Sequence, residues 1–375
     1  MKGDRDVESC LLWVILFSFR GVGAMHMADA LISPAVGGTM LAATAGIAAY
    51  SAKKVQNDMD ESKIPLMGVM GAFVFAAQMI NFSIPGTGSS GHLGGGMLLA
   101  ILLGPYAAFL TMASILLIQA LFFGDGGLLA YGCNVFNLGF YTCFVAYPLI
   151  YKKLVRKGVN PRSIFVGSMV SSMVGLQLGA FSVVVQTLLS GKTELPFVQF
   201  LLLMQPIHLA IGVIEGLATA AIVTFIWRAR PEILERAAFG ESLGGVPIKK
   251  VLTGLVVAVV IVGGLLSWFA STNPDGLEWS IERVTGTTEL ETPDGIHKIF
   301  SEIQSKTAFL PDYGFKTDQD DVQNQPAVED EEAWPSVDAG TSVSGIVGGA
   351  MTLVLAAFMG WIINILKKKR GKAVA

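Results

Sequence analysis

Long stretches with almost no charged residue constrain this chain more than any other feature of its sequence. Several apolar runs, among them 34–52, 164–189 and 343–366, reach about the 20 residues that an α-helix needs to cross a bilayer. Only 15% of the residues are charged, whereas an ordinary soluble domain carries about 25%. A membrane barrel would instead show alternating segments of about ten residues. We therefore predict a polytopic α-helical membrane protein.

Charge and proline divide the apolar runs into expected spans. Gly104-Pro105 interrupts the run 97–123, and because proline ends or kinks a helix we split the run there. Lys and Arg favour the cytoplasmic side, and the basic stretch 152–162 lies on that side only if the run crosses twice. We expect spans at 34–52, 64–82, 94–103, 106–123, 135–150, 164–189, 206–227, 251–269 and 343–366. Met25 is then outside and the C-terminus inside.

The first 24 residues have the character of a leader. An apolar run at 11–19 is followed by Val22 and Ala24, small residues at the positions that precede a signal-peptidase cut before Met25. A second interpretation is that translation starts at Met25. Both give Met25 a free α-amine. A third, an uncleaved extra helix, would place that nitrogen in a peptide bond.

A free amine at Met25 would give the chain a compact set of nitrogen donors. The amine, the backbone nitrogen of His26 and the imidazole of His26 can bind one ion together. Four nitrogens in a plane suit Ni(II) or Cu(II), and Co(II) is also held by amine and imidazole donors. A lone Met-His pair usually binds nothing, and the fourth donor has to come from elsewhere. The other histidines of the chain are His92, His208 and His297.

Glycines surround His92. The segment 86–96 contains a G-x-G-x-x-G pattern, but no strand–helix unit surrounds it, so we reject a dinucleotide site. Glycine tolerates backbone conformations that other residues avoid, and non-helical backbone at membrane depth occurs only beside protein or a water-filled cavity. The segment therefore predicts a loop beside a cavity.

Several short motifs follow one another along the first part of the chain. The opening stretch 25–34 begins Met-His-Met-Ala-Asp-Ala, and further motifs lie at 91–94, 124–130, 134–137 and 208–216. Together they resemble the substrate-capture (M) component of energy-coupling-factor (ECF) cobalt and nickel transporters, the CbiM/NikM family. That family opens with Met-His-Ile-Pro-Asp-Gly, from which this chain departs at three positions, Met27, Ala28 and Ala30. The resemblance covers roughly residues 25–228.

The last part of the chain has a different pattern. Spans 251–269 and 343–366 flank a segment, 271–342, with sixteen Asp or Glu and four Lys or Arg. With the motifs at 273–279 and 310–313, this resembles the small companion (N) component of the same importers. The expected fold is all-α: a seven-helix bundle like that of an ECF substrate-capture component, plus two helices flanking an extracytoplasmic acidic segment.

The expected domains follow from these patterns. A leader or over-called start (1–24) precedes the M-like membrane domain (25–228). A cytoplasmic linker (229–250) leads to the N-like part (251–375).

The resemblance implies particular roles for polar residues. The metal ligands would be Met25 through its amine, His26 and His92. Side chains that orient the ligands would be Asp29, Ser89, Asn134 and Asn137, although a helix cap or turn explains each of these equally well. His208 and Glu215 are seven residues apart and share a helix face. They could line an ion path, pair with each other or form a structural hydrogen bond; His297 is expected to be exposed.

The resemblance also implies a function. We expect a subunit in the cytoplasmic (inner) membrane of a bacterium or archaeon that captures Co²⁺ or Ni²⁺ from outside. The chain has no ATP-hydrolysing motif, so the family implies a transmembrane coupling (T) subunit and cytoplasmic ATPase (A) subunits as partners. Its other partner is the lipid bilayer, and no nucleic acid is expected. The alternative is a membrane-embedded metal sensor or scaffold without transport. A metalloenzyme is the weakest interpretation, since no HExxH motif or carboxylate pair lies in a span.

Overall fold

The computed structural model describes residues 26–58, 63–192, 194–239, 248–288, 290–291, 293–316 and 335–374. In these ranges six helices are long and apolar enough to cross a membrane. They are Pro34–Asn57, Pro105–Phe123, Tyr131–Val155, Pro161–Leu189, Phe197–Ala229 and Ala339–Lys369. A helix-rich membrane fold is therefore confirmed, while the total of nine spans stays a prediction.

The described elements follow one another as short and long helices with one small hairpin. The M-like part contains η1 (Asp29–Leu31), α2 (Pro34–Asp58), α3 (Lys63–Gln78), β1 (Phe82–Ile84), β2 (Ser89–Gly91), α4 (Gly96–Leu103), α5 (Pro105–Ile118), η2 (Gln119–Phe123), α6 (Tyr131–Val135), η3 (Phe136–Tyr151), α7 (Lys152–Val155), α8 (Pro161–Leu189) and α9 (Phe197–Ala229). Then come α10 (Pro231–Phe239), α11 (Lys249–Gly264), η4 (Leu266–Phe269), α12 (Gly276–Thr285), α13 (Ile296–Thr307), η5 (Pro311–Tyr313) and α15 (Ala339–Val374).

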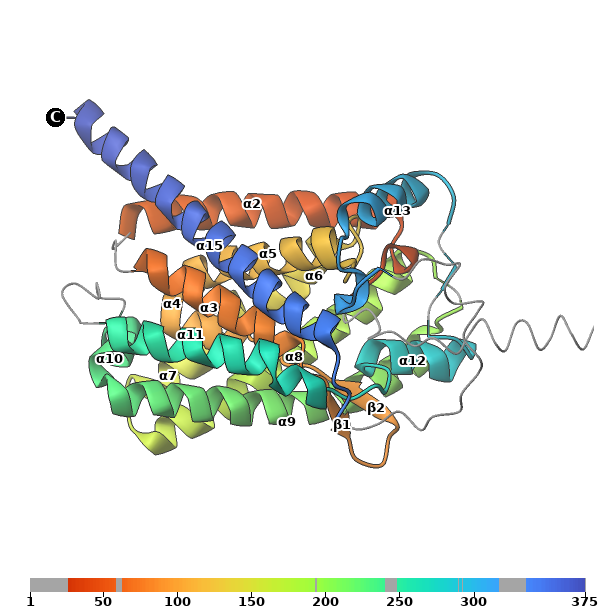
Figure 1. Ribbon diagram of the computed structural model, residues 1–375, viewed down its shortest axis with the longest axis horizontal. Coiled ribbons are helices and arrows are strands. Elements are labelled where there is room, and N and C mark those ends of the chain that lie inside the picture. Colours follow the sequence, from red (N-terminus) through yellow and green to blue (C-terminus); the bar gives the residue numbers. More distant parts are fainter. Residues whose placement is uncertain are drawn as a thin grey trace, which may run out of the picture.

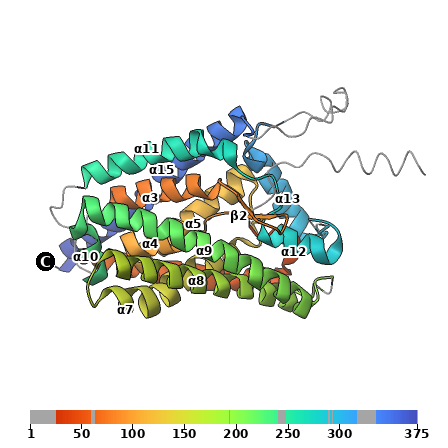
Figure 2. The same ribbon diagram turned by 90° about the horizontal axis from the view of Figure 1, so that it is seen from below.

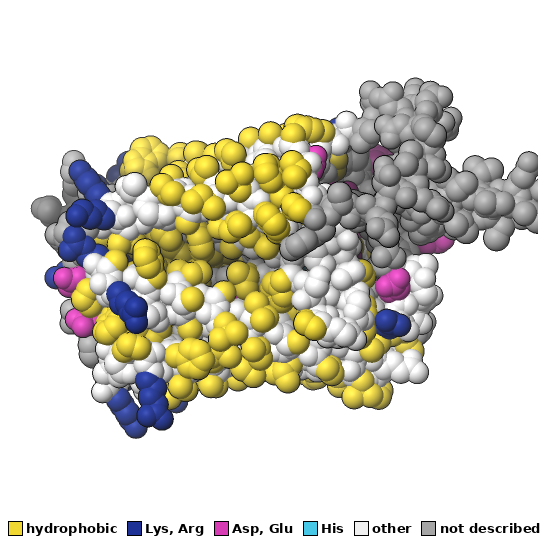
Figure 3. Space-filling model, turned by 60° about the horizontal axis from the view of Figure 1, so that its bottom comes forward, with side chains coloured by type: hydrophobic (Ala, Val, Ile, Leu, Met, Phe, Trp, Pro, Cys, Tyr) yellow, Lys and Arg dark blue, Asp and Glu magenta, His cyan; other side chains and the backbone are white. Residues whose placement is uncertain are grey.

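The long helices run side by side along the long axis of the molecule (Figures 1 and 2). The hairpin, α12 and α13 lie at one end, and the C-terminus lies at the other. Lys and Arg side chains gather at the C-terminal end, and apolar side chains cover the surface between the ends (Figure 3). Every residue of α4 is buried, as expected for a helix that is apolar on all sides.

The expected break at Gly104-Pro105 is confirmed. Gly104 has φ 80° and ψ 164°, and Pro105 is the first residue of α5. At that position the missing N–H of proline costs nothing, because a first-turn N–H has no partner within the helix.

Two expected spans differ from the structure. The span predicted at 64–82 ends at Gln78, and the next residues form an antiparallel hairpin in the register Phe82↔Gly91 and Ile84↔Ser89. An all-α fold is therefore wrong for this segment. Gly86 and Gly88 have φ near +75° in the turn (78° and 74°), which glycine adopts without strain.

The helix predicted at 206–227 is longer than expected. It begins at Phe197, and Pro206 lies inside it. Neighbouring helices can satisfy the backbone groups that a proline leaves unpaired in a membrane helix, and α9 packs along α8. Pro206 is therefore tolerated inside the helix and does not begin it.

The N-like part packs against the M-like part over two regions. The helices α11 and α15 both lie against α3. At the other end, α12 begins with a capping box in which Asp275 accepts from Leu277 and Glu278 backbone N–H groups and Glu278 returns a contact to Asp275. The capping box determines where α12 begins, and α12 packs against α9.

Candidate metal centre

His26 and His92 come together from distant parts of the chain. Their ring centroids are 5.4 Å apart. His26 Nδ1, His26 Nε2 and His92 Nδ1 are buried and have no hydrogen-bond partner in the described part of the chain. Buried polar atoms are nearly always satisfied. Two nitrogens without any partner, beside a third that faces only a carboxylate, therefore indicate a site for a ligand that imidazole can bind.

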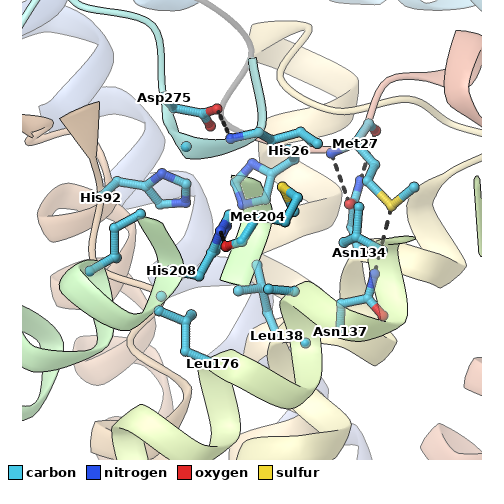
Figure 4. Close-up of a pocket in the computed structure, with 17 residues that line it drawn as sticks. His26, Met27, His92, Asn134, Asn137, Leu138, Leu176, Met204, His208 and Asp275 are labelled. Atoms are coloured by element: carbon cyan, nitrogen blue, oxygen red, sulfur yellow. Dashed lines mark hydrogen bonds between the residues drawn. The ribbon is translucent and has the colours of Figure 1, made fainter. Parts of the chain in front are cut away.

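A cavity of about 80 Å³ lies against the two rings (Figure 4). This is room for an ion with its remaining ligands, since one water occupies about 30 Å³ of the liquid. The polar lining residues are His26, His92, Asn134, Asn137, His208 and Asp275, and two thioethers, Met27 and Met204, also line it.

Asp125 supplies negative charge at this site. Its Oδ2 lies 3.0 Å from His26 Nδ1, so the two groups form an ion pair when the imidazole is protonated. Burial disfavours charge on both groups, but their mutual attraction outweighs it, so the pKa of His26 is raised and that of Asp125 is lowered. The ring of His92 behaves differently, because burial and the nearby His26 lower its pKa to about 3. His92 is therefore neutral, the form that binds metal ions.

The segment that carries His26 is held by an amide and a carboxylate. Asn134 accepts from the backbone N–H of Met27 at 3.0 Å and donates to the Met27 carbonyl at 3.1 Å. Asp29 accepts from the Ala130 N–H at 2.9 Å. Asn137 forms a reciprocal amide pair with Gln186 and also donates to the Met27 sulfur. Asn134 and Asn137 thus contact the N-terminal segment directly, and Asp29, which belongs to that segment, ties it to Ala130.

Ser89, the fourth, contributes differently. Its hydroxyl donates to the carbonyl of Ser90 within the hairpin, and it does not line the cavity. The structure therefore gives Ser89 a local turn contact.

The loop that carries His92 is fastened to the helix α9. The carboxylate of Glu215 accepts the N–H of Gly94 at 2.7 Å and of Gly95 at 3.0 Å. His208 instead has its Nδ1 at 2.8 Å from the Met204 carbonyl and lines the cavity. The two residues do not pair with each other, and the structural-hydrogen-bond interpretation holds for Glu215.

The N-like part closes one side of the cavity. The carbonyl of Pro274 accepts from the N–H of Ser90 at 2.8 Å, and Asp275 and Leu277 line the cavity. Gly276 packs so closely on α9 that a Cβ there would lie 3.2 Å from His208 Cε1. The Pro-Asp-Gly-Leu-Glu motif therefore builds one wall of the site.

The expected exposure of His297 is wrong. This residue is 5% exposed, and its Nε2 lies 2.8 Å from the Ile32 carbonyl. The helix α13 is thereby anchored beside the N-terminal segment, which an acidic, amphipathic sequence did not indicate.

Sequence reasoning missed three residues of the site. Asp125, Asp275 and Tyr313 belong to the motifs at 124–130, 273–279 and 310–313, but these motifs alone predict no role for them at the metal site. One signal in the sequence was a charged residue, Asp125, with a glycine on each side, between two apolar runs. In the structure both glycines, Gly124 and Gly126, have positive φ, 73° and 80°.

The predicted amine donor, Met25, and the leader 1–24 lie outside the described residues. Within the described ranges no group of three or more His, Cys, Asp or Glu side chains could hold a metal ion. The predicted ligand set does not need such a group, because it has two imidazoles and takes its other nitrogens from the main chain.

Residues 26–233 match the family described as "Cobalt uptake substrate-specific transmembrane region". The chain belongs to this CbiM family. Residues 249–365 match the PDGLE domain, so a companion-type domain follows the CbiM region, and with its six apolar helices the chain is a multi-pass membrane protein.

Other members of the CbiM family are named for nickel or for cobalt. An Archaeoglobus fulgidus protein provisionally named as the fused nickel transport protein NikMN is 30% identical over 88% of this chain and 96% of its own length. The Rhodobacter capsulatus fused nickel transport protein NikMN is 32% identical over 56% of this chain and 64% of its own length. The Sorangium cellulosum cobalt transport protein CbiM is 30% identical over 48% of this chain and 80% of its own length.

Proposed function

We propose that this chain is the substrate-capture subunit of an ECF-type importer and that it takes Co²⁺ or Ni²⁺ from outside the cell. One observation carries the proposal: the enclosed imidazoles of His26 and His92 meet beside a cavity, where His26 Nε2 and His92 Nδ1 have no partner among the described residues and His26 Nδ1 faces the Asp125 carboxylate. Imidazole nitrogen is a preferred donor for both ions. The names of the related CbiM proteins support the same cargo.

The ligands are the two imidazoles, the backbone nitrogen of His26 and the α-amine of Met25. One residue can bind an ion through its own backbone nitrogen and imidazole only by way of Nδ1, since Nε2 lies on the far side of the ring. Nδ1 is the atom beside Asp125. The buried carboxylate would then offset part of the charge of a divalent ion.

The direction of transport is supported by the charge on the surface. Lys and Arg side chains gather at one end of the molecule (Figure 3), and α12, whose first residues line the cavity, lies at the other end (Figure 1). Basic residues favour the cytoplasmic side. The cavity then opens toward the outside of the cytoplasmic membrane. Energy for inward delivery comes from a separate coupling subunit and ATPase subunits.

Removing either imidazole tests the ligand set. His26→Ala and His92→Ala should each abolish high-affinity binding of Ni²⁺ and Co²⁺ by the purified full-length chain, measured by calorimetric titration. His208→Ala is the matched control, because its Nδ1 already contacts the Met204 carbonyl, and its affinity should stay within about tenfold of the native chain. Native affinity in either of the first two variants would show that the ligand set is wrong.

The amine ligand gives a second, independent test of the ligand set. Amino-terminal sequencing of the active protein from membranes should give Met25 as the first residue. An intact residue 1 in metal-binding protein would contradict the chelate. Metal content after exposure to equal amounts of both ions identifies the preferred cargo.

A further inference from the structure

Tyr313 of the N-like part reaches the metal centre of the M-like part. It is 2% exposed, and its hydroxyl donates to Asp125 Oδ2 at 2.6 Å. Its ring stacks on Phe123 with centroids 5.1 Å apart and planes 20° apart. The Ser344 hydroxyl donates to its carbonyl at 2.8 Å. Tyr313 is thus fixed by contacts of its side chain and of its main chain with separate elements.

The backbone at Tyr313 is held in an unusual conformation. Asp312 and Tyr313 are the non-glycine residues with positive φ in the described part of the chain, at 49° and 59°. Such a conformation costs about 1–2 kcal/mol per residue and persists where surrounding contacts impose it, often at functional sites. Here the left-handed turn brings the hydroxyl to Asp125.

One carboxylate oxygen serves two contacts. Oδ2 of Asp125 accepts from Tyr313 and also lies 3.0 Å from Nδ1 of His26. Burial and the negative charge of Asp125 raise the pKa of Tyr313 well above its ordinary value, so the hydroxyl keeps its proton and is the donor. The resulting sequence of contacts is Tyr313 to Asp125 to His26.

We propose that Tyr313 is a positioning residue of the metal centre: its hydroxyl holds the Asp125 carboxylate against the His26 imidazole. The inference rests on the proposed function and adds to it that the companion domain contributes directly to ion affinity. The carboxylate faces Nδ1, the atom assigned to the ion, so it would lie beside a bound ion. Loss of a group that surrounds and orients metal ligands typically costs about 10–100-fold in metal affinity. The hydroxyl fixes which oxygen faces the ring, a task that the aromatic ring alone cannot perform.

The test is Tyr313→Phe in the full-length chain, because it keeps the ring stacked on Phe123 and removes only the hydroxyl. Titration with Ni²⁺ and with Co²⁺ should show affinity about 10–100-fold weaker than native. The visible absorption of the Co²⁺-loaded protein should also shift, because the ligand field at His26 changes. The matched control is Tyr131→Phe, which removes a hydroxyl that donates to the Ala113 carbonyl at 2.8 Å and should change neither reading.

A double-mutant cycle tests whether Tyr313 acts through the carboxylate. Asp125→Asn should weaken binding at least as much as Tyr313→Phe, and combining the two should cost less than the sum of both. If Tyr313→Phe does not accumulate as folded protein, Asp125→Glu replaces it. That variant keeps the charge and displaces it by one methylene group, so positioning predicts weaker binding.

The outcomes separate this inference from the proposed function. Native affinity and native spectrum in Tyr313→Phe, with binding lost in His92→Ala, would overturn the role of Tyr313 and leave the ligand set standing. An equal loss in Tyr131→Phe, additive losses in the cycle, or native affinity in Asp125→Glu would also overturn it. Native affinity in both His26→Ala and His92→Ala would overturn the proposed function and this inference together.

Discussion

Glu215 shows how a single buried side chain supports the site from a distance. Its two oxygens accept the N–H groups of Gly94 and Gly95, two and three residues after His92. A buried carboxylate without partners would be very costly, and the open turn after His92 offers donors that no helix uses. The residue therefore serves both the stability of α9 and the placement of the His92 ring.

Replacing this carboxylate should affect stability and ion binding together. Glu215→Ala removes two hydrogen bonds to a charged group, and about 1.5–3 kcal/mol for each should lower the thermal midpoint in detergent. Affinity for Ni²⁺ should fall as well, because the His92 loop loses its anchor. Gln205→Ala, on the same helix, removes a neutral contact to the Gln177 carbonyl and should leave affinity unchanged. Native affinity in Glu215→Ala would mean that other contacts hold the His92 loop.

At the scale of elements, loops at the end of the molecule with the hairpin and α12 bring the candidate site together, and the helices hold these loops in place. The loop 124–127 passes directly beneath the N-terminal segment. A Cβ added to Gly126 would lie 2.9 Å from His26 Cβ and 3.0 Å from Asn134 Nδ2. In the hairpin turn, a Cβ on Gly86 would meet nothing within 4 Å. Both glycines have positive φ, 80° and 78°, so they differ only in what surrounds them.

This pair separates backbone strain from crowding of the ligand. Alanine at either position should cost about 1–2 kcal/mol for the left-handed backbone. Gly126→Ala should in addition push His26 out of place and weaken Ni²⁺ binding, whereas Gly86→Ala should bind as the native chain does. Thermal unfolding of both variants measures their stability, and titration measures their affinity for Ni²⁺. Equal affinities would show that the loop adapts without moving His26.

At the scale of the whole molecule, the helix α2 presents an open face. The small residues Ala42, Ala45, Gly46 and Ala49 are all exposed, while Thr44 on the opposite side is buried and donates to the Gly132 carbonyl. Small residues allow membrane helices to approach closely. We therefore expect this face to contact the coupling subunit of the importer.

A larger side chain on that face should uncouple transport from capture. Ala45→Leu should reduce metal uptake by cells and co-purification of the coupling subunit, and leave the affinity of the purified chain unchanged. Ala221→Leu is the matched control, since Ala221 is exposed on α9 and should tolerate leucine. Loss of ion binding with the complex intact would place the α2 face inside the working bundle.

The helical character, the break at Gly104-Pro105 and the family follow from local pattern alone. The length of an apolar run, a proline or a glycine affects the backbone within a few residues, so these effects can be predicted from the sequence. The histidine ligands could be proposed because their motifs are short and contiguous. The hairpin and the start of α9 were missed, because a Gly-rich turn and an interior proline each permit more than one backbone path.

The sequence by itself determined that this is an apolar helical chain of the CbiM family with a companion-type domain, and it identified His26 and His92 as ligand candidates. Only the tertiary structure decided what surrounds them. Asp125 and Tyr313 are 188 residues apart in the chain, yet the Tyr313 hydroxyl lies 2.6 Å from the Asp125 carboxylate. No spacing rule connects positions so far apart. Burial also reassigned His297 and gave Glu215 its hydrogen-bond partners, because the partner of a buried polar group depends on which backbone atoms the packed helices leave unpaired.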